Sequence, residues 1–300
     1  MRDGPTQTLG KNPNRRRRND REFGTVRDFD RIYADGDFHR MSDIVERHRS
    51  ERKRFYDLLT SNVGKGQGGD RARVLEVGCG TAIDSLALAE ATNCRAHGVD
   101  LSIEAIKTAL EASSTFKVGM ELAQADAHNL PFKDEAFDLV FSQGVLEHFS
   151  DPRPVVEEQR RVLRSGGRLI ISVPQKYTAY TLAKRRRIRK GTWPWGYESE
   201  FSFRALRSLA DSLELQVMAV IGYGYWLHPF EPMWLLRSLS QKVRKLPVLG
   251  ATRPVRWASQ VYDRLWCSLE SRAGHHFMRD IAIVFATPLM LARENSKDRS

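Results

Sequence analysis

Cysteine is scarce in this sequence, and long apolar runs are absent from it. The 300 residues include three cysteines, Cys79, Cys94 and Cys267. An odd number without metal-ligand spacing argues against a disulfide framework or a metal site, and it predicts buried thiols in a reducing, cytoplasmic compartment. No stretch approaches ~18 consecutive apolar residues and the N-terminus has no apolar segment, so neither a membrane span nor export is expected.

Acidic residues are few in two segments, which carry the excess positive charge. The net charge is +11, yet residues 1–27 hold eight Lys or Arg against three acids, and residues 184–190 hold six with no acid. The rest of the chain is therefore balanced. Residues 1–24 are predicted to be a disordered basic tail. Such a tail is either solvated without a specific role or attracted to anionic lipid or nucleic acid.

A glycine turn follows the first predicted strand. The residues Val74-Leu-Glu-Val-Gly-Cys-Gly-Thr-Ala82 begin with apolar positions and end in two glycines, where a backbone approaches a ligand closely. A helical pattern then begins at Ile83, which is typical of the nucleotide-binding corner of a doubly wound α/β fold. Dinucleotide sites have a third glycine where this chain has Ile83. Glu76 would also oppose a pyrophosphate, whereas it suits a cationic ligand with hydroxyl and amino groups.

Acidic residues also follow the next two predicted strands. Residues 94–100 form a predicted strand that ends in Asp100, about 20 residues past the turn, where an acid accepts ribose hydroxyls in either cofactor class. The alternative is that Asp100 only marks a turn. Ser102 is predicted to cap the following helix. A third strand, over residues 119–125, leads into Asp126.

These elements resemble the class I S-adenosylmethionine-dependent methyltransferases. The turn is similar to the first motif of that family, with Ala82 where many members have glycine. The resemblance covers residues 70–175 and is closest to the ubiquinone/menaquinone-biosynthesis-like small-molecule methyltransferases. It implies S-adenosyl-L-methionine as cofactor. The cofactor-binding residues that it implies are Glu76, Gly78, Cys79, Gly80, Asp100, Leu101, Asp126, Ala127 and Gln143.

The resemblance implies an α/β fold with a doubly wound, seven-stranded, mostly parallel sheet and an antiparallel last strand. The methyltransferase domain is assigned to residues 70–290, after a helical N-terminal extension at 25–69 that contains Tyr33. Tyr33 is predicted either to lie against the cofactor or to pack in the core. The remaining predicted segments are a basic and aromatic loop at 174–201, a helical insertion between strands six and seven at 224–279, and a disordered tail at 291–300.

Candidate acceptor-site residues follow the fourth and fifth strands. Methyl transfer from a sulfonium is an in-line displacement that needs alignment, and a hydroxyl or carbon acceptor also needs a base. His148 is the predicted catalytic base, and Glu147 is predicted to orient the substrate, unless the pair only shapes the pocket. Weaker candidates for the base are Tyr177, His228 and His275. The residues predicted to contact the acceptor, or else to form a structural lid, are Trp193, Trp195 and Tyr197.

The predicted insertion is basic and amphipathic. Apolar residues recur at helical spacing over residues 232–246 and 254–270, with Lys and Arg beside them in the first of these. Such helices favour an anionic membrane surface, so the sequence predicts a cytoplasmic protein that is peripheral at the inner membrane surface. The alternatives are a cap over the pocket or a dimer contact.

Three function classes follow from these patterns. The first is S-adenosylmethionine-dependent methylation of a small-molecule or lipid-linked acceptor, at oxygen or carbon. The second is an RNA methyltransferase, which the arginine clusters suggest, although an appended RNA-binding fold and paired catalytic cysteines are not recognisable. The third is a noncatalytic S-adenosylmethionine-binding protein. The intact residues that argue against this third class are Glu76, Gly78, Gly80, Asp100 and Asp126.

Overall fold

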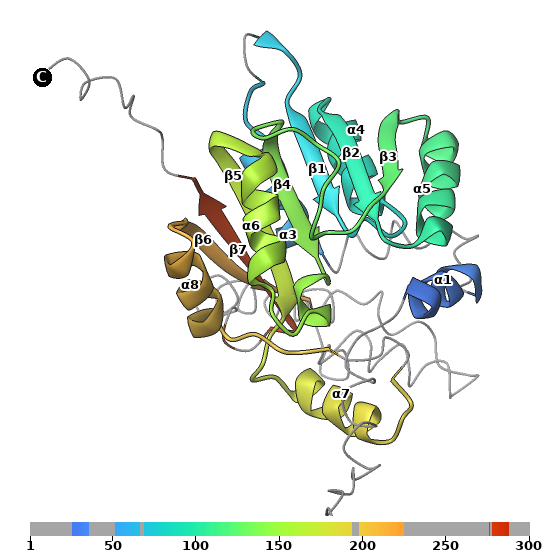
Figure 1. The fold of residues 1–300 in the computed structure, drawn as a ribbon, viewed down its shortest axis with the longest axis vertical. Helices are drawn as coiled ribbons and strands as arrows, with labels where there is room; N and C mark the ends of the chain where they lie inside the picture. Colours follow the sequence, from blue (N-terminus) through green and yellow to red (C-terminus); the bar gives the residue numbers. More distant parts are fainter. Residues whose placement is uncertain are drawn as a thin grey trace, which may run out of the picture.

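The computed structural model describes residues 26–35, 52–66, 69–193, 198–224, 276 and 278–287. In these residues, seven strands form one sheet in the order β3-β2-β1-β4-β5-β7-β6 (Figure 1). Strands β1 to β5 are parallel, and β7 lies antiparallel between β5 and β6. The predicted fold class is confirmed. The strands are β1 Arg73–Val77, β2 Arg95–Asp100, β3 Met120–Gln124, β4 Phe137–Gln143, β5 Leu163–Pro174, β6 Gln216–Tyr223 and β7 Asp280–Ala286.

The strand order reverses at β1, which pairs with β2 on one side and β4 on the other. In open α/β sheets, ligands bind at such a point, beyond the carboxyl ends of the strands. Strand β7 runs the other way, so its first residue, Asp280, pairs with Pro174 and Tyr223 at the same edge. In Figure 1 this is the lower edge of the sheet, next to α1 and α7.

Helices cover both faces of the sheet. The face with α6 and α8 buries side chains such as Val155 and Leu206 against Leu75 and Phe285. On the opposite face, α3 and α4 bury side chains such as Phe55 and Leu88 against the same strands. The helices are α1 Val26–Asp35, α3 Lys53–Asn62, α4 Ile83–Thr92, α5 Ile103–Phe116, α6 Arg153–Val162, α7 Ala179–Arg189 and α8 Phe203–Ser212, with a short 3-10 helix η2 at Leu146–His148.

Capping residues explain where two of these helices begin. The hydroxyl of Ser102 accepts a hydrogen bond from the backbone N–H of Ala105 and starts α5, as predicted. Ser202 caps α8 in the same way, through the N–H of Ala205. Ser102 follows the end of β2, and Ser202 follows Phe201, which bridges to Gln175 just after β5. Both helices therefore begin near the carboxyl ends of the strands.

The predicted basic and aromatic loop at 174–201 is wrong in part, because Ala179–Arg189 forms helix α7. Thr178 caps this helix through the N–H of Thr181, and the Ala, Leu, Lys and Arg residues that follow have high helix propensity. The run of Lys and Arg suggested an exposed loop and so hid the helix propensity of these residues. The second half of the predicted loop lies partly outside the described residues, which resume at Glu198.

The structure describes much of the predicted N-terminal extension but little of the predicted insertion. In the N-terminal extension, α1 and α3 are helices as expected, whereas residues 36–51 lie outside the described residues. The predicted insertion lies outside them except for Gly224, His276, Met278 and Arg279. Across the described ranges, no helix has the length and apolar character that crossing a membrane requires.

Candidate active site

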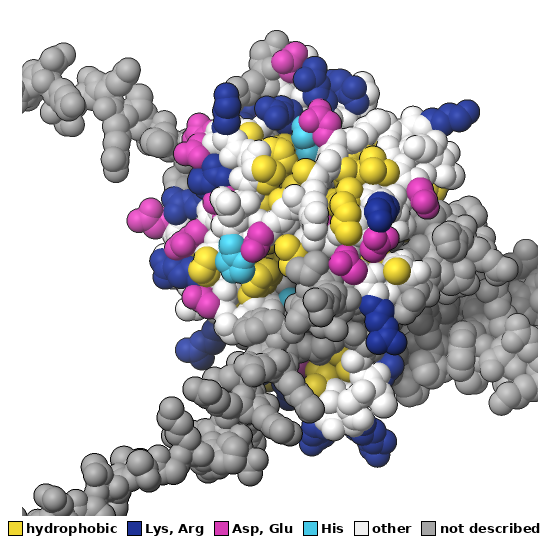
Figure 2. All heavy atoms as spheres, turned by 45° about the vertical axis from the view of Figure 1, so that its right-hand side comes forward, with side chains coloured by type: hydrophobic (Ala, Val, Ile, Leu, Met, Phe, Trp, Pro, Cys, Tyr) yellow, Lys and Arg dark blue, Asp and Glu magenta, His cyan; other side chains and the backbone are white. Residues whose placement is uncertain are grey.

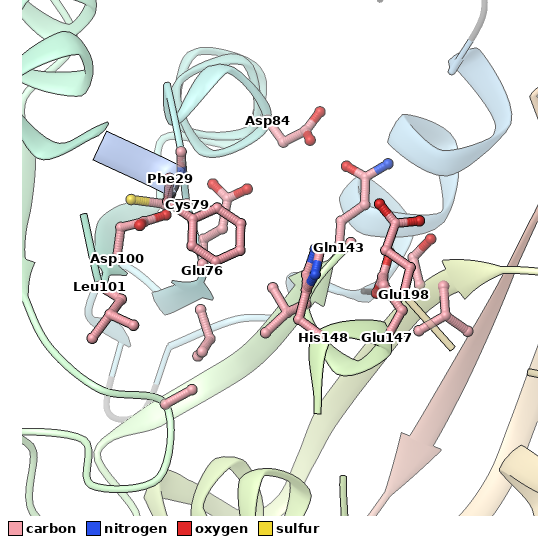
Figure 3. Close-up of a pocket in the computed structure, with 18 of the residues that line it drawn as sticks. Phe29, Glu76, Cys79, Asp84, Asp100, Leu101, Gln143, Glu147, His148 and Glu198 are labelled. Carbon is pink, nitrogen blue, oxygen red and sulfur yellow. Dashed lines mark hydrogen bonds between the residues drawn. The ribbon is translucent and has the colours of Figure 1, made fainter. Parts of the chain in front are cut away.

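One cavity of about 580 Å³ opens at the carboxyl ends of β1, β2, β4 and β5. All nine residues that the sequence assigned to cofactor binding line it, and so do His148 and Trp193. Figure 3 shows Asp100, Leu101 and Cys79 together on one side of the cavity. His148 separates that side from Glu147 and Glu198. The cavity therefore has two ends, the first of which holds the glycine turn.

The glycine turn allows a close approach that no side chain would permit. Gly78 and Gly80 have φ angles of +69° and +51°, which L-residues rarely adopt. A Cβ atom on Gly78 would collide with the side chain of Val145, and one on Gly80 would lie 2.5 Å from the hydroxyl of Tyr33. Ala82 also has a positive φ, of 56°, which explains why glycine suits that position in related turns.

Asp100 fixes the turn and keeps acceptor capacity for a ligand. Its Oδ2 accepts a hydrogen bond of 2.8 Å from the N–H of Gly80, and its Oδ1 accepts one of 2.9 Å from the N–H of Ser102. Burial raises the pKa of Asp100 despite these hydrogen bonds. A carboxylate oxygen has two lone pairs, so each oxygen still has room to accept a hydrogen bond from a ligand hydroxyl.

Glu76 lies at the end of β1 and is buried. Its carboxylate accepts hydrogen bonds from the hydroxyl of Ser85 at 2.5 Å and from the N–H of Ser85 at 3.3 Å. Burial raises the pKa of Glu76, and the nearby carboxylate of Asp84 raises it further. Asp84 is itself paired with Arg52 of the segment before α3, at 2.9 Å. A cationic group in this part of the cavity would relieve the buried negative charge.

Asp126 lies at the rim, directly after β3. It accepts a hydrogen bond from the N–H of His128 and pairs with the imidazole Nδ1 of His128 at 2.9 Å. Burial would raise its pKa, but the hydrogen bonds from His128 outweigh burial, and the pKa lies below its usual value. Asp126 therefore stays ionised at neutral pH and presents an acceptor to a ligand that lies along the ends of β1, β2 and β3.

Helix α1 closes the first end of the cavity. Phe29 and Tyr33 from this helix line the cavity, and Asp30 accepts a hydrogen bond of 2.5 Å from the hydroxyl of Ser102. Burial raises the pKa of Tyr33, and the carboxylate of Asp100 raises it further. Tyr33 thus lines the cavity and also packs against the glycine turn, so both roles predicted for it stay predictions.

His148 lies in η2, between the two ends of the cavity (Figure 3). Its ring packs edge-on against Phe29 of α1, with ring centroids 5.2 Å apart. The structure brings it to the cavity, whereas the weaker candidate Tyr177 is 69% exposed and does not line it. The other two candidates, His228 and His275, lie outside the described residues.

The second end of the cavity is rich in charged and aromatic residues. Trp193 lines the cavity, and its contact with the acceptor stays a prediction, whereas Trp195 and Tyr197 lie outside the described residues. Sequence reasoning missed most of its other residues, because they come from helix α7, a loop and a strand end that carry no motif. These missed residues are Tyr180, Glu198, Arg279 and Asp280.

Comparisons with known proteins agree with the geometry. Residues 75–171 match a family described as a methyltransferase domain. The chain is 31% identical over 137 residues to a demethylmenaquinone methyltransferase from Staphylococcus epidermidis, covering 44% of this chain and 54% of that protein. It is also 31% identical over 120 residues to a phosphoethanolamine N-methyltransferase from Triticum aestivum, covering 40% and 22%. The chain thus spans about half or less of the length of these relatives.

The fold also has solved counterparts. One is the methyltransferase in a Haloferax volcanii complex with the Trm112 methyltransferase activator. The TM-score is 0.55 at 19% identity, and the match covers 87% of this chain and 97% of that chain. At this identity the likeness concerns the fold alone.

The residues of the first end fit S-adenosyl-L-methionine. The glycine turn lines the cavity, Asp100 retains acceptor capacity for hydroxyls, and the buried carboxylate of Glu76 suits a cationic ligand. Together with the family match, these features assign the cofactor. The chain therefore carries a class I S-adenosylmethionine-dependent methyltransferase domain.

Proposed function

We propose that this protein methylates a small-molecule or lipid-linked acceptor, at oxygen or carbon. The observation that carries the proposal is the continuous cavity, which joins the cofactor residues to a second, separately lined end. Its volume is in the range of small-molecule sites. The names of the two curated relatives, a demethylmenaquinone methyltransferase and a phosphoethanolamine N-methyltransferase, support a small acceptor, and the second adds nitrogen as an alternative acceptor atom.

The bound cofactor supplies a methyl group that is already activated as part of a sulfonium. The chain's own residues align the reactants, and such alignment lowers the activation barrier by several kcal/mol. His148 is proposed to accept the proton of a hydroxyl or carbon acceptor, because it lines the cavity between the two ends. Phe29 packs against its imidazole and restricts the orientation of the ring.

The proposal is tested with the full chain, a labelled methyl donor and a metabolite extract. Label is expected in the small-molecule or lipid fraction. Label that is found only in RNA would support the alternative class of RNA methyltransferases. Absence of any transfer by a chain that binds S-adenosylhomocysteine would support the noncatalytic alternative.

The matched variant for this assay is Asp100→Ala. It removes the acceptor for ligand hydroxyls and frees the N–H of Gly80, so donor affinity should fall by about 1–3 kcal/mol, or roughly 5- to 150-fold. Calorimetry with S-adenosylhomocysteine measures this. Asp57→Ala, which removes an exposed carboxylate of α3, serves as the control. Equal affinity in Asp100→Ala and the unaltered chain would contradict the assigned role.

We also propose that the protein contacts an anionic membrane surface. Fewer basic side chains are free to face a membrane than the sequence suggested. Lys184 is buried and paired with Glu198, and Arg185 is paired with Glu200. The basic side chains of α7 and its end that are exposed are Arg186, Arg187, Arg189 and Lys190. In Figure 2, Lys and Arg side chains project at the lower end of the molecule, the level at which Figure 1 draws α7.

Liposome flotation tests this contact. Binding should require anionic lipid, fall with added salt, and drop roughly tenfold or more in the triple variant Arg186→Gln, Arg187→Gln, Arg189→Gln. The control variant Arg153→Gln, which changes an exposed arginine at the start of α6, should bind like the unaltered chain. Flotation that is absent at low salt would leave the insertion as a cap or a dimer contact.

A further inference from the structure

Three carboxylates from distant parts of the chain meet at the second end of the cavity. Glu147 comes from η2, Glu198 precedes α8, and Asp280 begins β7; all three line the cavity. Figure 3 shows Glu147 and Glu198 close together, on the far side of His148 from Asp100. Their charges interact, since Glu198 and Asp280 both act on Glu147. The way each carboxylate is paired distinguishes one of them from the other two.

Glu198 and Asp280 already have cationic or N–H partners. One oxygen of Glu198 accepts a hydrogen bond from the Lys184 ammonium at 3.1 Å, and the other accepts one from the Trp193 indole at 3.1 Å. Asp280 accepts a hydrogen bond of 2.9 Å from the Arg279 guanidinium. These two carboxylates are therefore neutralised and held in place by the protein itself.

Glu147 differs from them. Its residue is 3% exposed, and its Oε2 has no hydrogen-bond partner within the part of the chain that the structure describes. The carboxyl does accept a hydrogen bond from its own backbone N–H, but a buried oxygen without a partner is costly, because it loses the water that would solvate it. Burial, together with the charges of Glu198 and Asp280, raises the pKa of Glu147 to about 8.

The charged groups around Glu147 leave room for one added cation. Lys184 of α7 lowers the pKa of Glu147 but is committed to Glu198, and Arg279 is committed to Asp280. The other titratable side chains that line this region are Tyr180 of α7 and His148 of η2 itself. Once Glu147 ionises, this end of the cavity thus has one more carboxylate than these two paired cations balance.

We propose that this end of the cavity binds a protonated amine of the acceptor molecule, with the ammonium group paired to Glu147. The inference rests on the proposed function and adds a substrate class to it. The ammonium is the group by which the molecule is recognised, whereas the atom that receives the methyl group lies on the His148 side. The aromatic rings of Tyr180 and Trp193 line the same end and supply apolar surface for the carbon skeleton of such an amine.

An ammonium group fits this position for two physical reasons. Its N–H groups supply the donors that Glu147 Oε2 lacks, and its charge offsets the extra carboxylate. A neutral hydroxyl would supply a donor without the charge, so Glu147 would stay protonated below about pH 8. Cations and neutral molecules of the same shape should therefore differ in affinity.

The test uses the full chain saturated with S-adenosylhomocysteine and three pairs of probes. The pairs are benzylamine with benzyl alcohol, phenethylamine with phenethyl alcohol, and cyclohexylamine with cyclohexanol. Calorimetry at pH 8.5 should show at least one amine binding ~10-fold or more tightly than its alcohol, as expected for a buried charge pair. Affinity for that amine should also rise roughly 25-fold from pH 6.5 to 8.5, because Glu147 ionises while a primary amine stays protonated.

The variant Glu147→Gln separates recognition from structure. It should lose the preference for the amine and the pH dependence while keeping its affinity for S-adenosylhomocysteine and its cooperative thermal unfolding. The control Glu157→Gln, at an exposed position of α6, should keep both properties. The proposal is overturned if no amine binds better than its alcohol, or if Glu147→Gln keeps the preference. Loss of S-adenosylhomocysteine binding by the unaltered chain would instead count against the proposed function.

Discussion

Glu147→Gln is expected to become more stable than the unaltered chain as the pH rises from about 4.5 to 8. The folded-state pKa of Glu147 is raised to about 8, above the value near 4.5 that an unfolded chain would show. Between these values the unfolded state releases a proton that the folded state retains, so the free energy of unfolding of the unaltered chain falls with pH. Glutamine has the same shape and no such proton.

The size of this effect follows from the width of the pH window. One pKa unit corresponds to ~1.4 kcal/mol, and the pKa of Glu147 is raised from 4.5 to about 8, so the variant should gain up to about 4–5 kcal/mol near pH 8 relative to the unaltered chain. The gain should vanish well below pH 4.5, where Glu147 is protonated in both states. Urea unfolding at a series of pH values measures it, with Glu157→Gln as the reference. Parallel curves for all three proteins would show that Glu147 is solvated in the folded protein.

Lys184→Met is expected to lose about 3–5 kcal/mol of stability, because it leaves the buried carboxylate of Glu198 without its ammonium partner. The side chain of Lys184 is fully buried, and methionine approximates its length without the charge. Chemical unfolding at pH 7 measures the loss. Lys190→Met, at an exposed position after the same helix, should change stability little.

A second substitution tests the cause of that loss. In the double variant Lys184→Met, Glu198→Gln the unpaired charge is gone, so most of the lost stability should return. The Trp193 indole can still donate to the amide oxygen of the glutamine at position 198, which preserves the loop that carries Trp193. If the double variant were no more stable than Lys184→Met, the unpaired charge of Glu198 would not be the cause of the loss. Lys184 would then stabilise the protein through the packing of its side chain alone.

The residues at the cofactor end of the cavity could be predicted from the sequence, because each stands at or just after the end of a strand. Gly78, Asp100 and Asp126 each follow an apolar run, and parallel strands bring such positions to one edge. The cavity lined by all three shows that this inference placed them correctly. Strand β7 is likewise a local feature, since it is an unbroken apolar segment after Asp280.

The second end could not be predicted, because its contacts join residues that are far apart in the sequence. Glu147 is followed 51 residues later by Glu198, and Asp280 comes 82 residues after Glu198. Neither spacing belongs to a motif. The burial of Lys184 was also hidden, since a lysine within a run of arginines is typical of a solvated surface. It becomes evident only when α7 is placed against Glu198 and Glu200.

The pairing of Tyr223 with Asp280 places the two ends of segment 224–279 on neighbouring strands. The chain leaves β6 and re-enters β7 at one point of the cavity rim, so the sheet fixes where the intervening segment is anchored and leaves its length open. Closing a loop costs only ~0.6 kcal/mol more for each doubling of its length. Segments of very different size could thus be exchanged at this position without disturbing the sheet. The connection from β6 to β7 is a natural graft point, where acceptor preference could be re-engineered while the cofactor end stays unchanged.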